Sequence, residues 1–166
     1  MTEQAQKEVL IGRLVKADPI PADHVRRILE MEAVERASPQ LYLCTINGSP
    51  YSTAEELFIV AFDPKTDFTI LPWLKDKLQK PLGIRDTIGG AFINKIAPSE
   101  RILANSYELI LVSKLEPTGI WFDQTFFVTF DTAREMVAKG ATGAEVSPDT
   151  ITTIAVDLKP GYDVAR

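Results

Sequence analysis

The sequence contains one cysteine, Cys44, and one histidine, His24. A single cysteine excludes an internal disulfide and a cysteine-based zinc site. Cys44 lies in the apolar run LYLCTI, so we expect a small buried side chain rather than a reactive thiol. His24 lies at a predicted helix start, without a readable carboxylate and nucleophile around it and without a G-x-S-x-G motif. We therefore expect a solvated helix residue.

Long apolar runs and an excess of basic residues are also missing. No stretch approaches the ~18 apolar residues that a membrane span needs, and the longest nearly uncharged apolar stretch, Leu109 to Ser113, has the size of a strand. The N-terminus lacks the apolar region of a signal peptide. With a net charge of −5, the chain is not expected to bind nucleic acid or an anionic membrane surface.

What remains is the composition of an ordinary globular protein, with 45% apolar and 25% charged residues among 166. This length suffices for one domain with a substantial core. Strand and helix signals are mixed without strict β-α-β alternation, and no internal repeat or linker is visible, so the pattern predicts an α+β fold with a mixed sheet and short helices.

Hydrophobic patterning and turn residues place the elements along the chain. The expected strands are Gln40–Ile46, Glu56–Phe62 (buried on both faces), Tyr107–Leu115, Thr125–Phe130 and the alternating Ile151–Leu158. The expected helices are Gln4–Lys16, a helix capped by Asp23 that ends before Ala33, one begun by Pro72 and stopped by Pro81, and Thr132–Lys139, capped by Asp131 and ended by Gly140.

Glycines mark several predicted turns. Asn47-Gly48 is a strong hairpin signal between two strands. The segment LGIRDTIGG matches neither the dinucleotide-binding nor the P-loop pattern. Its glycines, Gly83, Gly89 and Gly90, are therefore expected to serve turns with positive φ.

Two carboxylates, Asp63 and Asp67, lie in the segment FDPKTDFTILPWL. The segment lacks the Asp/Asn-Gly ladder and the terminal Glu of a calcium loop. Glycosidase chemistry needs two carboxyls about 5–9.5 Å apart across a cleft, which a turn can meet by accident. Asp-Pro at a strand end is ordinary turn chemistry, so a structural turn is preferred; metal binding, catalysis and partner contact stay open as alternatives.

A second cluster, LEPTGIWFDQTFF, joins two strands and places Ile120, Trp121 and Phe122 together in a predicted loop. Two interpretations compete. The aromatic side chains fold back as a lid on the core, or they form an exposed patch that contacts a partner.

Together these segments resemble a known family. VERASPQLYL, VAFDPKTDFTILPWL, LEPTGIWFDQTFFVTFDTAREM and SPDTITTIAVDLKPG occur in an order similar to that of the extracytoplasmic domain of FtsX/MacB-like ABC transporter permeases. The matching positions are Ser38-Pro39, the FDPKTDF run with Pro72-Trp73, Leu115-Glu116 with Thr118-Gly119, Asp123, and Pro160-Gly161. The likeness covers roughly Glu8 to Arg166. It departs from the family pattern over residues 91–106, a candidate variable insert region.

The resemblance implies a single extracytoplasmic domain, residues 1–166, from between two transmembrane helices of a plasma-membrane permease, with a reduced insert subdomain. It implies no enzymatic activity and no cofactor. The implied partners are a cytoplasmic ATPase, a second permease subunit, and an external partner protein or transported substrate. The domain would relay ATPase-driven motion. No catalytic, cofactor-binding or metal-binding residue is predicted, and Trp73, Trp121 and Phe122 are the candidate partner contacts.

Two alternatives of other classes remain. A small enzyme would use Asp63, Asp67 or Asp123 as acid–base groups or as ligands of a hard metal ion, and it predicts that these carboxylates converge in a pocket. A soluble module that binds lipid or peptide predicts a deep apolar pocket.

Overall fold

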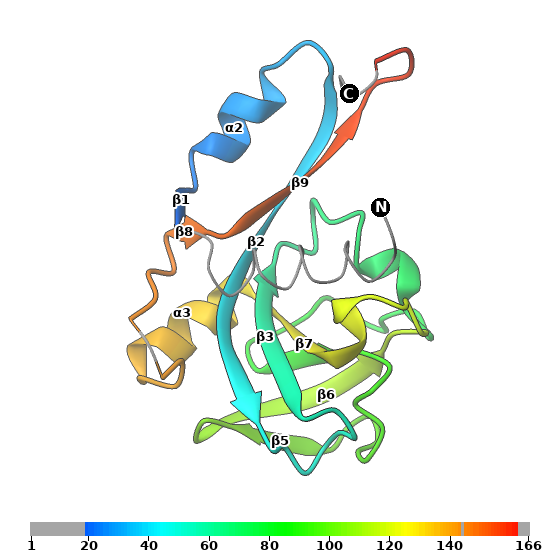
Figure 1. Ribbon diagram of the computed structural model, residues 1–166, viewed down its shortest axis with the longest axis vertical. Helices are drawn as coiled ribbons and strands as arrows, with labels where there is room; N and C mark the ends of the chain where they lie inside the picture. Colours follow the sequence, from blue (N-terminus) through cyan, green and yellow to red (C-terminus); the bar gives the residue numbers. More distant parts are fainter. Residues whose placement is uncertain (1–18, 144, 163–166) are drawn as a thin grey trace.

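A computed structural model describes residues 19–143 and 145–162 and has an α+β fold with one large mixed sheet (Figure 1). The predicted helix Gln4–Lys16 lies outside the described residues. The strands are β1 (Ile20–Pro21), β2 (Val34–Asn47), β3 (Glu56–Phe62), β4 (Asp86–Gly89), β5 (Arg101–Ala104), β6 (Tyr107–Lys114), β7 (Thr125–Thr129), β8 (Thr150–Ile151) and β9 (Thr153–Leu158). The helices are α2 (His24–Leu29) and α3 (Phe130–Ala138), and the 3₁₀ turns are η1 (Leu71–Trp73) and η2 (Trp121–Gln124).

The sheet has the strand order β5-β6-β4-β7-β3-β2-β9, and β1 and β8 form a separate two-stranded pair. The β3–β7 and β4–β6 pairs are parallel, and the other neighbours in the large sheet are antiparallel. This mixture agrees with the fold class predicted from the sequence.

The central strands β3 and β7 separate two hydrophobic cores. Alternate residues of β3 point to opposite faces, so Leu57, Ile59 and Ala61 join one core while Phe58, Val60 and Phe62 join the other. Helix α3 covers the first core, and η2 covers the second. The prediction that Glu56–Phe62 is a strand buried on both faces is confirmed for Leu57–Phe62.

Strand β2 begins at Val34, well before the predicted start at Gln40. It continues through Pro39 because β2 changes partners there: Val34–Gln40 pair with β9, and Gln40–Asn47 pair with β3. Pro39, which has no N–H to donate, therefore lies where β2 has a neighbour on one side only.

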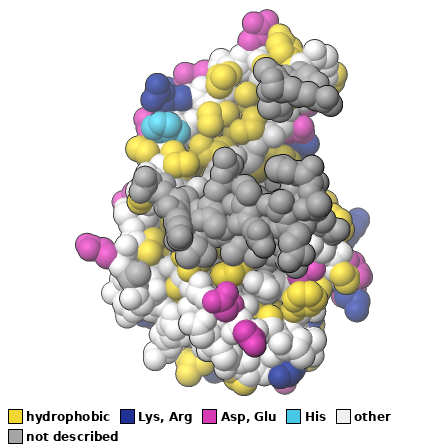
Figure 2. Space-filling view, in the orientation of Figure 1, with side chains coloured by type: hydrophobic (Ala, Val, Ile, Leu, Met, Phe, Trp, Pro, Cys, Tyr) yellow, Lys and Arg dark blue, Asp and Glu magenta, His cyan; other side chains and the backbone are white. Residues whose placement is uncertain are grey.

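Helix α2, the first half of β2 and β9 form an arm that projects from the rest of the molecule, which we call the body (Figure 1). Several large apolar side chains of the arm and its tip are exposed: Leu29, Met31, Val156 and Tyr162. Figure 2 shows hydrophobic side chains gathered on the arm. The predicted helix at Val25–Leu29 is confirmed, but Asp23 makes no side-chain cap hydrogen bond and instead contacts the ring of His24.

Two other predicted helix ends need correction. Helix α3 is capped by Thr129, whose hydroxyl accepts a hydrogen bond from the Thr132 N–H. Thr129 has the extended backbone typical of a cap residue, whereas Asp131 already lies in the first turn of the helix. Gly140 does end α3 in the left-handed conformation, as predicted. The helix predicted from Pro72 is only the turn η1, since Leu74 is already extended and pairs with Leu115.

The glycines of LGIRDTIGG do not have positive φ, which corrects the prediction of left-handed turns. Gly89 ends the unpredicted strand β4, and Gly90 passes directly against the backbone of Phe122 and Asp123. Absence of a side chain, rather than freedom of φ, is what this position requires. Gly48 does have the predicted positive φ, in the longer loop 48–55 between β2 and β3.

Residues 91–106, where the family pattern departs, contain a loop and the edge strand β5. Asn105 and Ser106 both have positive φ at the tight turn between β5 and β6. This is the backbone of a two-residue hairpin whose twist matches that of the strands.

Candidate functional site

The segment that follows β3 is a compact turn organised by Asp67. One carboxylate oxygen of Asp67 accepts hydrogen bonds from the Thr69 backbone N–H (3.1 Å) and hydroxyl (2.9 Å). The other oxygen accepts from the Ile70 N–H (3.0 Å) and the Leu71 N–H (2.8 Å). Asp67 thus satisfies the free N–H groups where η1 begins.

Asp63 and Asp123 also hold turns. The Asp63 carboxylate accepts from the Lys65 N–H (2.9 Å), and its carbonyl accepts from the Asp67 N–H (3.0 Å). Asp123 is buried and accepts from the Thr118 N–H (2.8 Å), the Thr118 hydroxyl (2.7 Å) and the Gly119 N–H (2.9 Å). The preferred interpretation of Asp63 and Asp67 as turn residues is confirmed by these hydrogen bonds, and Asp123 acts in the same way.

The turn at residues 63–71 contacts one face of β2 where β2 changes partners. The Gln40 side-chain amide donates to the Thr69 hydroxyl (3.1 Å), and the hydroxyls of Ser38 and Thr66 lie 3.3 Å apart. Both Ser38 and Gln40 are buried. We call this set of contacts the brace, because it fixes the turn against the junction of arm and body.

One further contact extends the brace into the arm. The guanidinium of Arg36 lies over the ring of Phe68, 4.4 Å from its centroid, and also pairs with Asp157 of β9. Arg36, Ser38 and Gln40 alternate along β2 and so share one face. Sequence reasoning missed the brace, because the predicted strand began only at Gln40 and the partners of these side chains come from a distant turn.

The aromatic cluster after Leu115 is buried. Trp121 and Phe122 are 3% and 6% exposed, and their rings stack edge-on at 4.6 Å. Phe122 also contacts Phe127 of β7 edge-on at 5.2 Å. The arrangement is that of the lid on the core, one of the two interpretations left open by the sequence.

Trp73 differs from these two residues, because it is 43% exposed at the end of η1. Of the three candidate contact residues, it alone presents a large apolar surface to solvent. The structure does not bring Trp73 into the cluster of Trp121 and Phe122, whose rings pack on one another.

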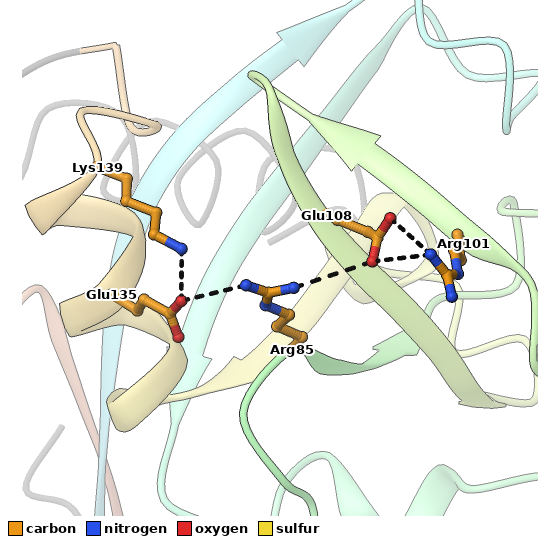
Figure 3. A network of polar contacts seen from close by, with 5 residues as sticks. All are labelled: Arg85, Arg101, Glu108, Glu135 and Lys139. Carbon is orange, nitrogen blue, oxygen red and sulfur yellow. Dashed lines mark hydrogen bonds and ion pairs between the residues drawn. The ribbon is translucent and has the colours of Figure 1, made fainter.

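A charged network on the body was not predicted (Figure 3). Arg85, which precedes β4, lies 3.5 Å from Glu135 of α3 and 4.0 Å from Glu108 of β6. Lys139 pairs with Glu135 at 2.7 Å, and this hydrogen bond is the main cause that lowers the pKa of Glu135. The groups are partly exposed, so the network adds little to stability. Only the Glu135–Lys139 spacing of four residues was visible in the sequence.

The lone cysteine and histidine have the expected settings. Cys44 is buried, and burial raises the pKa of its thiol from about 9 to about 11. A thiol with so high a pKa is a poor nucleophile at neutral pH. His24 lies partly exposed at the start of α2 beside Asp23.

The two alternative classes predict a cluster of carboxylates and a deep apolar pocket, respectively. Within residues 19–143 and 145–162, no three His, Cys, Asp or Glu side chains are grouped so as to hold a metal ion. Two surface hollows are open to solvent and lined largely by polar residues, one beside Lys75 and one beside Glu55. They do not resemble the deep apolar pocket that a lipid- or peptide-binding module predicts. None of the helices described is long and apolar enough to cross a membrane.

The geometry defines an α+β domain in which a braced arm projects from a body with two cores. Its fold is similar to a solved structure described as the extracellular domain of the noncanonic ABC-type transporter YknZ from Gram-positive bacteria. The TM-score is 0.52 with 9% sequence identity, over 86% of this chain and 75% of that chain. No protein-family model and no curated protein sequence matches the chain. The fold predicted from the family resemblance is therefore confirmed.

Proposed function

We propose that this chain is the extracytoplasmic domain of an ABC transporter permease of the FtsX/MacB-like type. The observation that carries the proposal is the fold similarity to the YknZ extracellular domain over 86% of the chain. The motifs FDPKTDF and LEPTG support it independently, since they suggested the same family from the sequence. In this proposal residues 1–166 form one domain between two transmembrane helices, on the outer side of the plasma membrane.

In this proposal the domain transmits motion and binds a partner or substrate, and it does not catalyse a reaction. The turn hydrogen bonds of Asp63, Asp67 and Asp123 account for the carboxylates that an enzyme would use. A separate cytoplasmic ATPase would hydrolyse ATP, and the domain would relay the resulting motion to an external partner protein or substrate.

Strand β2 is the element suited to that relay. It runs without interruption from the arm into the body, over roughly 45 Å at the rise of an extended strand (Figure 1). The brace holds its midpoint through Ser38 and Gln40. Displacement of the arm would therefore move β2 and the turn at 63–71 together, and with them Trp73, the most accessible of the proposed partner contacts. Trp121 and Phe122 would contribute to that contact only by supporting the surface from beneath.

The test is to read the coding sequence on both sides of this segment in its native gene. We expect an apolar span of about 18 or more residues on each side and an ATPase encoded nearby. A free-standing reading frame of 166 residues would contradict the proposal.

A further inference from the structure

The hollow beside η1 gathers basic side chains from three separate segments. It has a volume of about 650 Å³ and is lined by Lys75, Lys95 and Lys114, together with Asp76 and Glu100. Lys75 follows η1, Lys95 belongs to the loop after β4, and Lys114 ends β6. The backbone N–H of Lys75 donates to the carbonyl of Lys114 (2.9 Å), so these two lysines are held next to each other by the fold.

None of these three ammonium groups has an ion pair among the described residues. Other cations of the body and arm are paired, such as Arg36 with Asp157, Arg134 with Asp131 and Lys139 with Glu135, whereas Arg27 and Lys65 have no ion pair in the described part of the chain but lie outside the hollow. Neighbouring like charges repel each other, and here no carboxylate of the described residues offsets that repulsion by an ion pair.

The two acids that line the hollow do not fully neutralise its three lysines. The Glu100 carboxylate accepts a hydrogen bond from the Ala97 N–H, which directs it toward its own loop. Asp76 and Glu100 together carry two negative charges against the three positive charges of the lysines, so the hollow keeps a net charge of about +1 in a protein whose net charge is −5. Three lysines without an ion pair to the described residues thus lie together in a protein that is negatively charged overall.

We propose that this hollow binds phosphate groups. Lysine ammonium groups bind phosphate as point charges, and lysines from three segments can reach different oxygens of one phosphate group. The volume lies within the range of small-ligand sites. The proposal does not depend on the transporter function, because it rests on the charges and shape of the hollow alone.

The test uses the 166-residue chain and pyrophosphate as the probe. In an amide NMR titration, we expect saturable shifts confined to residues near 75, 95 and 114, and weaker binding as salt is raised. Lys75→Gln with Lys114→Gln should weaken binding by about tenfold or more, since each removes a charged donor. The matched control removes two exposed cations elsewhere, Arg27→Gln with Lys65→Gln, and should leave the affinity nearly unchanged.

Absence of saturation at about 10 mM pyrophosphate together with absence of binding to vesicles that contain phosphatidic acid, or equal loss in the control, would overturn the proposal. A thermal melt of each variant checks folding, and Lys95→Gln alone supplies a milder variant if the double variant is unstable. A second arm uses phosphatidylcholine vesicles with and without phosphatidic acid. Binding only to the acidic vesicles assigns the site to lipid headgroups, and binding only to pyrophosphate assigns it to a free phosphate ligand; either supports the site.

Discussion

Gly90 lies where the chain leaving β4 passes against the backbone of η2. A Cβ at this position would lie 2.0 Å from the Phe122 carbonyl oxygen and 2.6 Å from the Asp123 carbonyl carbon. Both neighbours are backbone atoms, and the Gly90 N–H donates to the Thr125 carbonyl at 2.8 Å, so neither chain can move away freely.

We therefore expect Gly90→Ala to lower the free energy of unfolding by about 3 kcal/mol or more, measured by urea denaturation. Gly83→Ala is the control, because its Cβ would meet only the carboxylate of Asp86, at 3.3 Å, and no backbone atom of the described residues within 4 Å. It should stay within about 1 kcal/mol of the unsubstituted protein. Equal losses of stability in the two variants would show that the backbone at Gly90 does not lie this close to the backbone of η2.

Cys44 should make stability depend on pH in the alkaline range. Its thiol is neutral in the folded protein up to a pKa of about 11, against about 9 when unfolded, because burial disfavours the thiolate. The raised pKa contributes stability that is fully present below pH 9 and is lost as pH rises through 11.

Between these values the free energy of unfolding should fall by roughly 2–3 kcal/mol more in the unsubstituted protein than in Cys44→Ala. Urea denaturation of both proteins from pH 8 to about pH 11 measures the difference. Parallel pH profiles would contradict the burial of the thiol.

At the scale of elements, the cap of α3 distinguishes the structure from the sequence prediction. Thr129→Ala removes the hydroxyl that accepts from the Thr132 N–H and should cost about 1 kcal/mol in urea denaturation. Asp131→Ala removes only an exposed ion pair with Arg134 and should cost about 0.5 kcal/mol or less. A larger loss of stability in Asp131→Ala than in Thr129→Ala would indicate that Asp131 caps α3.

Elements with a strong local pattern could be predicted from the sequence, as β3, β6, β7 and α3 show. Strand β4 could not, because it is short, ends in glycine and is stabilised by β6 and β7, which are distant in sequence. The start of β2 was missed for a similar reason, since only pairing with β9 carries the strand through Pro39. The turn roles of Asp63 and Asp67 were local and predictable, whereas the brace depends on tertiary contact.

The brace should control the opening of the arm. Thr69→Val removes the hydroxyl that accepts from Gln40 and donates to Asp67, leaving the buried Gln40 amide without that partner. We expect faster amide hydrogen exchange in residues 36–40 and 153–157, with a stability loss of about 1–3 kcal/mol.

Exchange in β5 and β6 should change much less, because these strands lie at the far edge of the sheet. The control is Thr53→Val in the exposed loop before β3, where the hydroxyl contacts only Asn94. Uniform acceleration across the sheet in Thr69→Val would mean that arm and body open as one unit, which contradicts a local brace.

At the scale of the whole molecule, an arm joined to a two-core body by one continuous strand suits a part that moves against its surroundings. In the proposed function, the turn at 63–71, the lid at Trp121 and the exposed Trp73 would together hold a surface in place while β2 transmits force. The fold similarity to the extracellular domain of the transporter YknZ is the finding on which this proposed mechanical role rests.

The most direct test of that account is the location of this segment in the full-length gene product. Alkaline phosphatase, inserted into the loop 48–55, is active only outside the cytoplasm, where its disulfides form. A fluorescent protein inserted at the same place provides the opposite readout, because it fluoresces when it stays in the cytoplasm. The account predicts an active phosphatase and a dark fluorescent fusion. An inactive phosphatase with a bright fluorescent fusion would contradict it.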